Sequence, residues 1–372
     1  MEQTEFYNSF LSLVRLGIGH TPQVIPQPIN WKETEDFVNR HGLLAIVVDG
    51  IEKLPSVLRP PQELLLEWIG EVLQDYEYRY QQYFKTISEL AGFYNSHGLK
   101  MMVLKGYACS LDWPKPSHRP CGDIDIWQFG KQKEADEALK SFRIQDSSTS
   151  EAAKPSAGFK IDSSHHHHTV FEWDSFTVEN HYDFVNVHAH RSSAELEKIF
   201  KELGKDDTHY VEVHGEKVYL PSPNLHALFM IKHMVSHFAA AEINLRQVLD
   251  WAFFVEKHTK EIDWHWLNGM LDKYSMKDFV NCINGICVED LGFDAGIFQE
   301  VQFLPALKEK ILNDILNPEY TSAEPKGFAR RFIYKYKRWQ GNAWKQRVCY
   351  NESRWESFLF GLWAKMLKPA SI

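Results

Sequence analysis

Acidic side chains spaced two residues apart mark the segment DIDIW, which begins at Asp123. Its strict alternation of polar and apolar residues predicts a strand, so that Asp123 and Asp125 share one face. A second predicted strand contains the sequence VENH, in which Glu179 and His181 share a face. If the two strands are neighbours, three carboxylates converge, and such a cluster is tolerated mainly where cations neutralise it. Carboxylate oxygens suit Mg²⁺, and two such ions can hold a triphosphate during an in-line displacement.

An acid-x-acid triplet by itself is a weak signal, because the chain has further examples at 33–35 and 172–174. Taken alone, Asp123 and Asp125 are more typical of solvated acids on an exposed strand edge than of a metal-binding site. Gly106 and Gly122, which precede the two acids, and the later VENHY sequence make a site the better interpretation.

Three motifs together resemble a known superfamily. The chain has LKG at 104–106, RPCGDIDI at 119–126 and VENHY at 178–182. This order resembles the DNA polymerase β-like nucleotidyltransferases, and most of all an uncharacterised bacterial branch in which LKG stands where other members have Gly-Ser. The sequences PSPNLHALFMIKHMVSHF and INLRQVLDW resemble the helical region after the catalytic core of that branch. The resemblance covers about residues 30 to 260.

The resemblance implies roles for individual residues. Three carboxylates would be catalytic and would bind two Mg²⁺ ions, for which Mn²⁺ can substitute: Asp123, Asp125 and Glu179. Five residues would bind the NTP substrate: Lys105, Gly106, Arg119, Gly122 and Arg246. His181 would orient Glu179 or meet the acceptor. A glycine at the start of a helix lets N–H groups approach an anion, and arginine can clamp phosphate with two N–H groups.

Two assignments have alternatives. In the sequence VNVH, Asn186 could stand where the third carboxylate is expected, and an amide is a poorer metal ligand than an anion. We prefer Glu179, because VENHY follows the predicted turn at Asp174 and Ser175 directly and keeps the acid. Arg246 could instead form an ion pair with Asp250, four residues further along the same predicted helix.

Two other segments could bind ligands. The run His165 to His168 could bind a transition metal, but we expect these histidines to be partly exposed residues at the entrance of the active-site cleft. The tail after residue 325 contains eleven Lys or Arg and two Glu, so that it carries +9 and the rest of the chain −18. Its interleaved basic and aromatic residues suit single-stranded nucleic acid, and they suit a terminal amphipathic helix equally well.

The 372 residues are 44% hydrophobic and 24% charged, which is typical of globular proteins and excludes disorder and fibres. We expect an α+β fold: a nucleotidyltransferase core with a short mixed β-sheet at 96–220, an N-terminal helical unit at 1–95 and a C-terminal helical unit at 221–372. Five cysteines without a CxxC motif favour a reducing cytoplasm over a disulfide framework. The net charge of −9 argues against a membrane partner and makes nucleic acid the less favoured alternative.

The predicted function is metal-dependent transfer of an NMP from an NTP to a hydroxyl-bearing acceptor, such as a small molecule, a sugar or a protein, with release of pyrophosphate. Two other functions fit the sequence: a non-catalytic nucleotide-binding or partner-binding module that keeps the fold, and an RNA-directed transferase that uses the basic tail. The acceptor, the preferred base and the oligomeric state do not follow from the sequence.

Overall fold

The computed structural model describes residues 2–22, 29–146, 161–162, 168–299, 302–321, 323–357 and 359–360. The chain divides into two compact units, each built from segments that are far apart in the sequence. Unit 1 comprises Met1–Tyr78, Asp112–Pro120 and Met230–Asn351. Unit 2 comprises Arg79–Leu111, Cys121–Phe229 and Glu352–Ile372.

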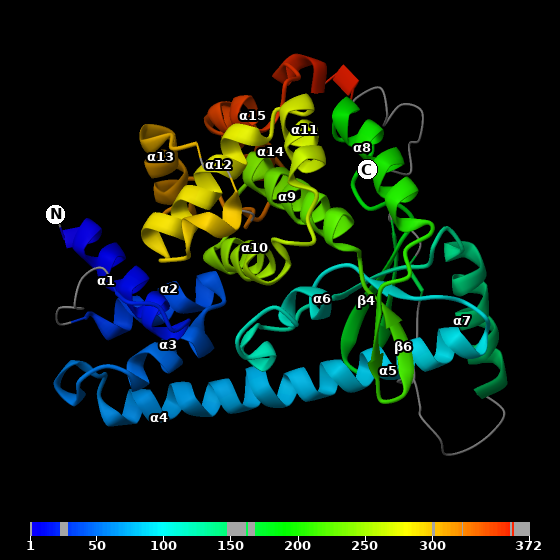
Figure 1. Ribbon diagram of the computed structural model, residues 1–372, viewed down its shortest axis with the longest axis horizontal. Helices are drawn as coiled ribbons and strands as arrows, with labels where there is room; N and C mark the ends of the chain where they lie inside the picture. The colour runs from blue at the N-terminus through cyan, green and yellow to red at the C-terminus, as the bar shows by residue number, and fades with distance from the viewer. Residues whose placement is uncertain are drawn as a thin grey trace. The chain divides into compact units, whose positions relative to one another are not determined.

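In its described residues, unit 1 is built from helices (Figure 1). Local signals define several helix ends: the side chain of Asn244 caps the N-terminus of α10 in a capping box with Gln247, and Gly42 ends α2 in the left-handed conformation, at φ 65°. The elements are α1 (Glu2–Gly17), α2 (Trp31–His41), α3 (Leu44–Glu52), η1 (Ser56–Leu58), α4 (Gln62–Glu71), η2 (Val72–Tyr78), η3 (Pro116–His118), most of α9 (Pro223–Ala240), α10 (Leu245–His258), α11 (Trp264–Lys273), α12 (Lys277–Gly285), η4 (Ile286–Asp290), η5 (Ala295–Phe298), α13 (Pro305–Leu316), α14 (Phe328–Gly341) and α15 (Ala343–Cys349).

The long helix that apolar spacing predicts over 63–95 is confirmed. It forms as α4, the π-helical segment η2 and α5 (Arg79–Ser96), which follow one another without a break in the helical backbone. The prolines at 60 and 61 precede it, and Gly98 follows its end in the left-handed region, at φ 70°.

Unit 2 contains a six-stranded mixed sheet with the strand order β3-β4-β2-β1-β6-β5. The strands β2 and β4 run parallel, as do β1 and β6, and the other neighbouring strands are antiparallel. The expected α+β fold with a short mixed sheet is thereby confirmed. Besides α5, the elements of unit 2 are β1 (Met102–Val103), α6 (Tyr107–Ser110), β2 (Ile124–Trp127), α7 (Gln132–Asp146), β3 (His168–Trp173), β4 (Phe176–His181), α8 (Arg191–Gly204), β5 (Tyr210–Val213), β6 (Glu216–Tyr219) and the first turns of α9.

Alternating residues around Asp174 and Ser175, and around His214 and Gly215, predict two hairpins, and both form. The turn between β3 and β4 consists of Asp174 and Ser175, and the turn between β5 and β6 consists of His214 and Gly215. All four residues have positive φ, as a two-residue type I′ connection requires. Each turn fixes the register of its hairpin, so that His168 lies opposite His181.

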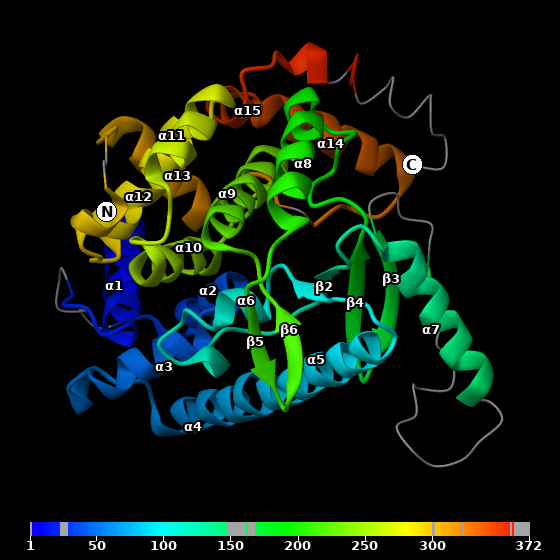
Figure 2. The same ribbon diagram turned by 45° about the vertical axis from the view of Figure 1, so that its right-hand side comes forward.

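The two faces of the sheet differ in chemistry. Ile124 and Ile126 of β2 and Val178 of β4 join the hydrophobic core, together with Tyr83 and other residues of α5. Figure 2 shows α5 passing across the strands and α7 lying beside β3 and β4. Because side chains alternate along a strand, the residues between these apolar positions point to the other face, and they are the predicted acids.

Some predictions concern segments whose structure is only partly described. A sequence rich in Ser, Ala, Lys and Gly predicts a surface loop at 145–164. Most of this loop, as well as His165 to His167, lies outside the described residues. Among the described residues, no helix has both the length and the apolar composition that crossing a bilayer requires.

Candidate active site

Asp125 and Glu179 are direct partners in the parallel pairing of β2 with β4. Their side chains therefore lie on the same face of the sheet, and Asp123, two residues before Asp125, is placed towards that face just ahead of β2. Asn186 lies outside the strands, exposed, where its side chain accepts a hydrogen bond from the backbone N–H of His188, 3.0 Å away. The structure thus brings Glu179 rather than Asn186 beside Asp125.

Asp125 is a buried carboxylate held between Lys105 and His181. Its Oδ1 lies 2.8 Å from Nζ of Lys105 and accepts a hydrogen bond from Nε2 of His181 at 3.0 Å. Burial by itself would raise the pKa of Asp125, but the charges of Lys105 and His181 outweigh burial and hold the pKa below its ordinary value. Asp125 is consequently ionised at neutral pH, with Lys105 as its counter-ion.

Glu179, His181 and His168 form a compact group on β3 and β4. Nε2 of His181 lies 3.3 Å from Oε2 of Glu179, and Nδ1 of His168 lies 3.9 Å from the same oxygen. One potential metal-ligand atom from each of the three residues lies within 4.8 Å of the other two. The hydrogen bond from His181 lowers the pKa of Glu179, and bonds to Asp125 and Glu179 raise the pKa of His181 against the opposing effect of its burial.

Asp123 is the solvent-accessible member of the acidic set. Partial burial, followed by the charges of Glu179 and Asp125, raises its pKa. Its backbone carbonyl accepts a hydrogen bond from the hydroxyl of Tyr83 on α5, at 3.0 Å. The helix that covers the core face of the sheet therefore also fixes the backbone that carries Asp123.

Gly106 allows this contact to form. Its φ of 57° and ψ of −99° disfavour other residues, and a Cβ at this position would lie 2.2 Å from Oη of Tyr83. The helix that follows Gly106, α6, has only four residues, so it supplies little helix dipole for binding an anion. The observed reason for glycine is the close approach of Tyr83, while its role towards phosphate stays a prediction.

The other residues predicted to bind nucleotide are divided between the two units. Gly122 of unit 2 is exposed, and an added Cβ would meet no atom within 4 Å. Arg119 of unit 1 is buried, and its Nε and Nη2 bond both oxygens of Asp250 at 2.8 and 2.9 Å. Arg246 also belongs to unit 1, where its guanidinium lies beside Gly42.

Sequence reasoning overlooked Arg79. This residue begins α5, donates from Nε to the carbonyl of Cys121 at 3.3 Å and stacks over the ring of Phe176 at 4.7 Å. Its charge lowers the pKa of Asp123, which opposes the larger effects of burial and neighbouring acids. No motif around Arg79 identifies it, because it stands in the middle of a long helical sequence.

His168 is a second residue whose role the sequence analysis did not specify. As the last histidine of a run of four, it was expected only at the entrance of a cleft. The two-residue turn at Asp174 and Ser175 was the available signal: counting back from it along both strands places His168 opposite His181.

The opposite face of β4 is fastened to α7 by a buried carboxylate. Asp136 accepts hydrogen bonds from Thr169 of β3 and from Asn180 of β4, both at 2.9 Å. It also accepts from the hydroxyl of Tyr182 at 3.0 Å. Since Asn180 lies between Glu179 and His181, this network fixes the strand that presents the two site residues.

The donor set fits a divalent cation. Asp125 and Glu179 lie side by side on neighbouring strands, and after partial burial the charges of these two carboxylates contribute to the raised pKa of Asp123. Oxygen donors suit Mg²⁺ or Mn²⁺, whereas the adjacent His168 and His181 add nitrogen donors that suit softer ions. Asp123, Asp125 and Glu179 are the residues that would hold magnesium.

A short mixed sheet with acidic side chains on two neighbouring strands is the core of a nucleotidyltransferase fold. Residues 27–292 match the family model described as uncharacterised nucleotidyltransferase, and the chain belongs to this family. No curated protein matches the sequence. Among solved structures, the chain is similar to an antigenic nucleotidyltransferase-like protein from Paracoccidioides brasiliensis, with 14% identity, a TM-score of 0.35 and coverage of 58% of this chain and 96% of that chain.

Proposed function

We propose that unit 2 transfers a nucleoside monophosphate from an NTP to a hydroxyl-bearing acceptor. The observation that carries the proposal is the pairing of Asp125 with Glu179 on parallel strands, with Asp123 two residues before Asp125. In the transfer, the acceptor oxygen bonds the α-phosphorus as the bond to the β-phosphate bridging oxygen breaks. Pyrophosphate leaves with that electron pair, and the acceptor proton passes to Glu179.

Two Mg²⁺ ions, or Mn²⁺ in their place, would neutralise the triphosphate and stabilise the charge on the leaving oxygen. The side chains of the protein have separate tasks. Lys105 neutralises Asp125 and would turn to a phosphate oxygen when a cation binds Asp125. His181 orients Glu179 and Asp125 through its single Nε2, because both carboxylates share that nitrogen. We further assign Arg79 to the phosphates.

The roles of four other residues are also part of the proposal. Gly106 and Gly122 would leave room for the triphosphate beside Asp123. For Arg119 and Arg246 a role in binding phosphate oxygens rests on the family resemblance alone. The free thiols of all five cysteines are compatible with the cytoplasmic location that we propose.

One observation favours a second function, a nucleotide-binding or partner-binding module without catalysis. Lys105 and His181 already satisfy Asp125 with a salt bridge and a hydrogen bond. A protein that uses Asp125 only to hold its own strands together would have the same contacts. The two functions differ in whether nucleotide binding depends on the metal.

The test is calorimetric titration of ATP, GTP, CTP and UTP with and without Mg²⁺. Asp123→Asn is the sharpest variant, because Asp123 is accessible and its loss leaves the buried contacts of Asp125 intact. Asp125→Asn is the second variant, and Glu212→Gln, at an exposed position on β5 at the far edge of the same sheet, is the control.

The transferase is supported if one NTP binds only with Mg²⁺, and if Asp123→Asn abolishes this binding while Glu212→Gln retains it. That NTP then identifies the base. Release of pyrophosphate from that NTP is then measured with candidate acceptors. Binding without any metal dependence supports the non-catalytic module. Absence of binding by the folded wild-type chain to all four nucleotides contradicts the transferase and favours a partner-binding module.

A further inference from the structure

The helix α14 exposes an unusual concentration of large apolar side chains. Phe328 is 89% exposed, Phe332 66%, Tyr336 55% and Ile333 54%. Among the described residues, no other helix or strand has more than two exposed large apolar residues. Contiguous exposed apolar surface on a soluble protein usually marks an interaction site.

The spacing of these residues places them on one side of the helix. Phe328, Phe332 and Tyr336 follow one another at intervals of four residues, and Ile333 lies beside this stripe. The helix also contains five basic residues and no acidic residue. On a wheel with 3.6 residues per turn, Arg330 and Lys337 lie on one flank of the stripe and the other basic residues on the opposite flank.

The opposite edge of α14 is attached to its own unit by polar contacts. The hydroxyl of Tyr334 donates to the carbonyl of Thr321 at 2.8 Å and accepts from its N–H at 3.0 Å. The carboxylate of Glu324 forms salt bridges with three residues, Arg331 at 3.3 Å, Lys335 at 3.3 Å and Arg338 at 3.7 Å. An amphipathic helix in a globular protein normally buries its apolar face. This helix is fastened by its polar edge and turns the apolar face outward.

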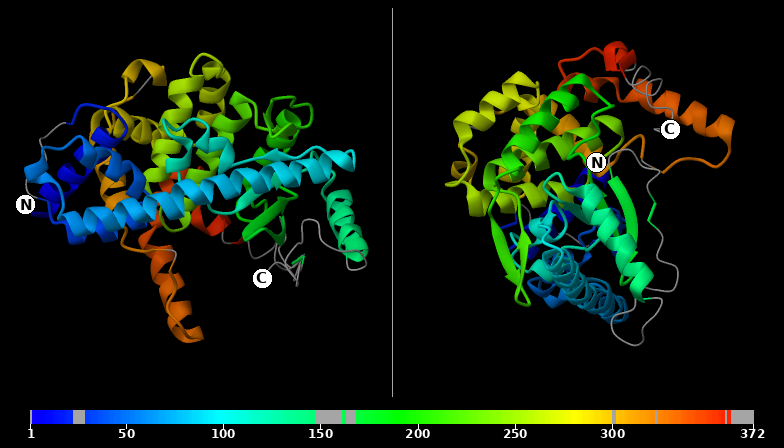
Figure 3. Two further views of the ribbon diagram at one scale, coloured as in Figure 1. Left: turned by 90° about the horizontal axis from the view of Figure 1, so that it is seen from below. Right: turned by 90° about the vertical axis from the view of Figure 1, so that its right-hand side faces the viewer.

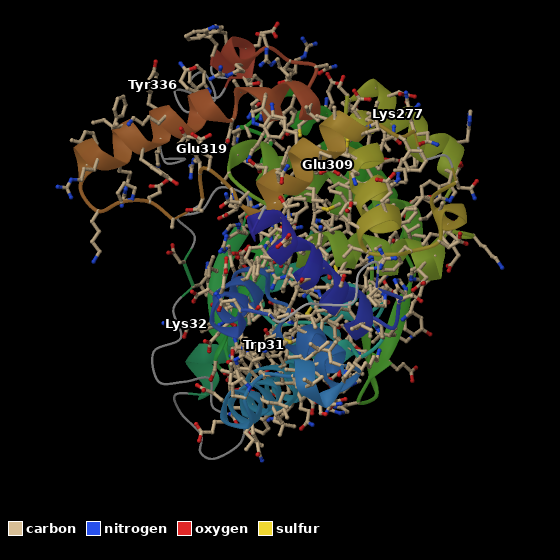
Figure 4. The ribbon with its side chains drawn as sticks, turned by 90° about the vertical axis from the view of Figure 1, so that its left-hand side faces the viewer. Trp31, Lys32, Lys277, Glu309, Glu319 and Tyr336 are labelled. Carbon is tan, nitrogen blue, oxygen red and sulfur yellow. The ribbon has the colours of Figure 1, made fainter. Side chains whose placement is uncertain are left out.

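Two views of the molecule agree with this description. In Figure 3, α14 projects from the other helices of unit 1. In Figure 4, Tyr336 lies on the side of α14 that points away from those helices. The sequence analysis left open whether the basic tail packs as a terminal helix, and the helix does form, but with its apolar stripe unpacked.

We propose that α14 binds the surface of a membrane containing anionic lipids. A helix lying in a lipid interface needs an apolar face that enters the acyl boundary and basic residues beside it that meet anionic headgroups. The stripe of Phe328, Phe332, Ile333 and Tyr336 supplies the first, and the basic flanks supply the second. The net charge of −9 does little to oppose such binding, because charges further than about 10 Å from the lipid surface are screened at physiological salt. The charges of α14 itself therefore dominate.

Other partners fit less well. Single-stranded nucleic acid binds in basic grooves where bases stack on aromatic rings, whereas this stripe lies on a convex helix and includes the aliphatic Ile333. Pairing of α14 with α14 of a second copy would bring five positive charges against five. A lipid surface satisfies the apolar and the basic residues together.

The experiment is vesicle co-sedimentation of the full chain. One set of vesicles contains phosphatidylcholine alone, and another also contains about 30% phosphatidylglycerol. The apolar variant is Phe328→Ser with Phe332→Ser, and the charge variant is Arg330→Glu with Lys337→Glu, which leaves the cations at Glu324 in place. The control is Leu66→Ser with Phe303→Ser, because these large apolar side chains are also exposed but lie on other segments, at 60% and 52%.

We expect binding to the anionic vesicles only, weakened at least about tenfold by either α14 variant and unchanged by the control. Raising the salt from about 0.1 M to 0.5 M should weaken the binding as well. The proposal is overturned if the wild-type chain does not sediment with anionic vesicles, or if the control variant loses as much binding as the apolar variant. Binding of poly(U) without binding of vesicles would indicate nucleic acid and overturn the proposal. A change in the sedimentation coefficient of the α14 variants without lipid would indicate pairing with a second copy and overturn it as well.

Discussion

The hydroxyl of Tyr83 lies directly over Gly106 and donates a hydrogen bond to the backbone carbonyl of Asp123, 3.0 Å away. This contact joins three separate parts of the chain: the long helix, the loop after β1 and the segment before β2. The position of Asp123 therefore depends on a glycine that lies 17 residues earlier in the sequence.

Replacement of Gly106 by alanine is expected to lower the free energy of unfolding by roughly 2–4 kcal/mol, because the new Cβ meets Oη of Tyr83 and the φ of 57° is strained for alanine. Chemical denaturation of Gly106→Ala, Tyr83→Phe and the double variant measures the coupling. Removing the hydroxyl relieves the clash, so the double variant should be about 1 kcal/mol more stable than additivity gives. Strict additivity would show that the two residues do not meet.

The sequence predicts the strands and turns of this site better than it predicts the residues from other elements that hold the site in place. Alternation along a strand identifies Asp123, Asp125 and Glu179, and two-residue turns set the hairpin registers, because both are short-range rules. Residues that act across the fold, such as Tyr83 and Arg79, have no local signature. The same limit explains why helices from both ends of the chain combine in unit 1, which is settled by packing between segments rather than by their periodicity.

Loss of Asp136 is expected to loosen the strand that carries Glu179 and His181. Asp136→Ala leaves three buried or half-buried donors, on Thr169, Asn180 and Tyr182, without this acceptor, which should cost roughly 3–5 kcal/mol of unfolding free energy. Glu137→Ala, at an exposed position on the same helix, is the control and should cost less than about 0.5 kcal/mol. Thermal denaturation of both variants checks the difference, and similar losses in the two would contradict the role of the network.

A histidine in unit 1 should make stability depend on pH. His118 is nearly fully buried and bonds Asp49 at 2.7 Å and Glu77 at 3.1 Å. Its burial would lower its pKa, and the charge of Lys115 does so as well, but the bonds to Asp49 and Glu77 outweigh them and raise the pKa above 6.5. A raised pKa in the folded state stabilises the fold fully below the unfolded value and loses this effect as the pH rises through the folded value.

The variant His118→Gln should therefore lose more unfolding free energy, relative to the wild type, at about pH 5.5 than at about pH 8.5. The pKa of Asp49 is lowered in the fold, so Asp49 stays ionised across that window and does not obscure the trend. His265→Gln, at an exposed histidine of the same unit, is the control. Denaturant titrations at the two pH values provide the comparison, and a loss of equal size at both would show that His118 is not charged in the fold.

The group of His168, Glu179 and His181 should bind Zn²⁺ more tightly than it binds Mg²⁺, because imidazole nitrogen is a preferred ligand of zinc. In a background where His165 to His167 are replaced by serine, His168→Gln is expected to weaken Zn²⁺ binding about tenfold or more. Competition with a chromophoric chelator measures the affinity. Mg²⁺-dependent nucleotide binding should change much less, since His168 lies outside the oxygen-donor set; an unchanged Zn²⁺ affinity would remove His168 from the metal-binding group.

Two basic side chains of unit 2 should contribute differently to nucleotide binding. Arg79 is half-buried near Asp123, and its replacement by glutamine is expected to weaken Mg²⁺-NTP binding about tenfold, equivalent to about 1.4 kcal/mol. The loss of its contacts with Cys121 and Phe176 should lower the free energy of unfolding only slightly. Lys105→Gln should weaken binding and also lower the free energy of unfolding, because buried Asp125 loses a salt bridge of 2.8 Å. Lys85→Gln, 55% exposed on the same helix as Arg79, is the matched control. Calorimetric titration paired with denaturation separates the two effects, and full nucleotide affinity in Arg79→Gln would remove Arg79 from the phosphate site while leaving the carboxylate pairing of β2 and β4 untouched.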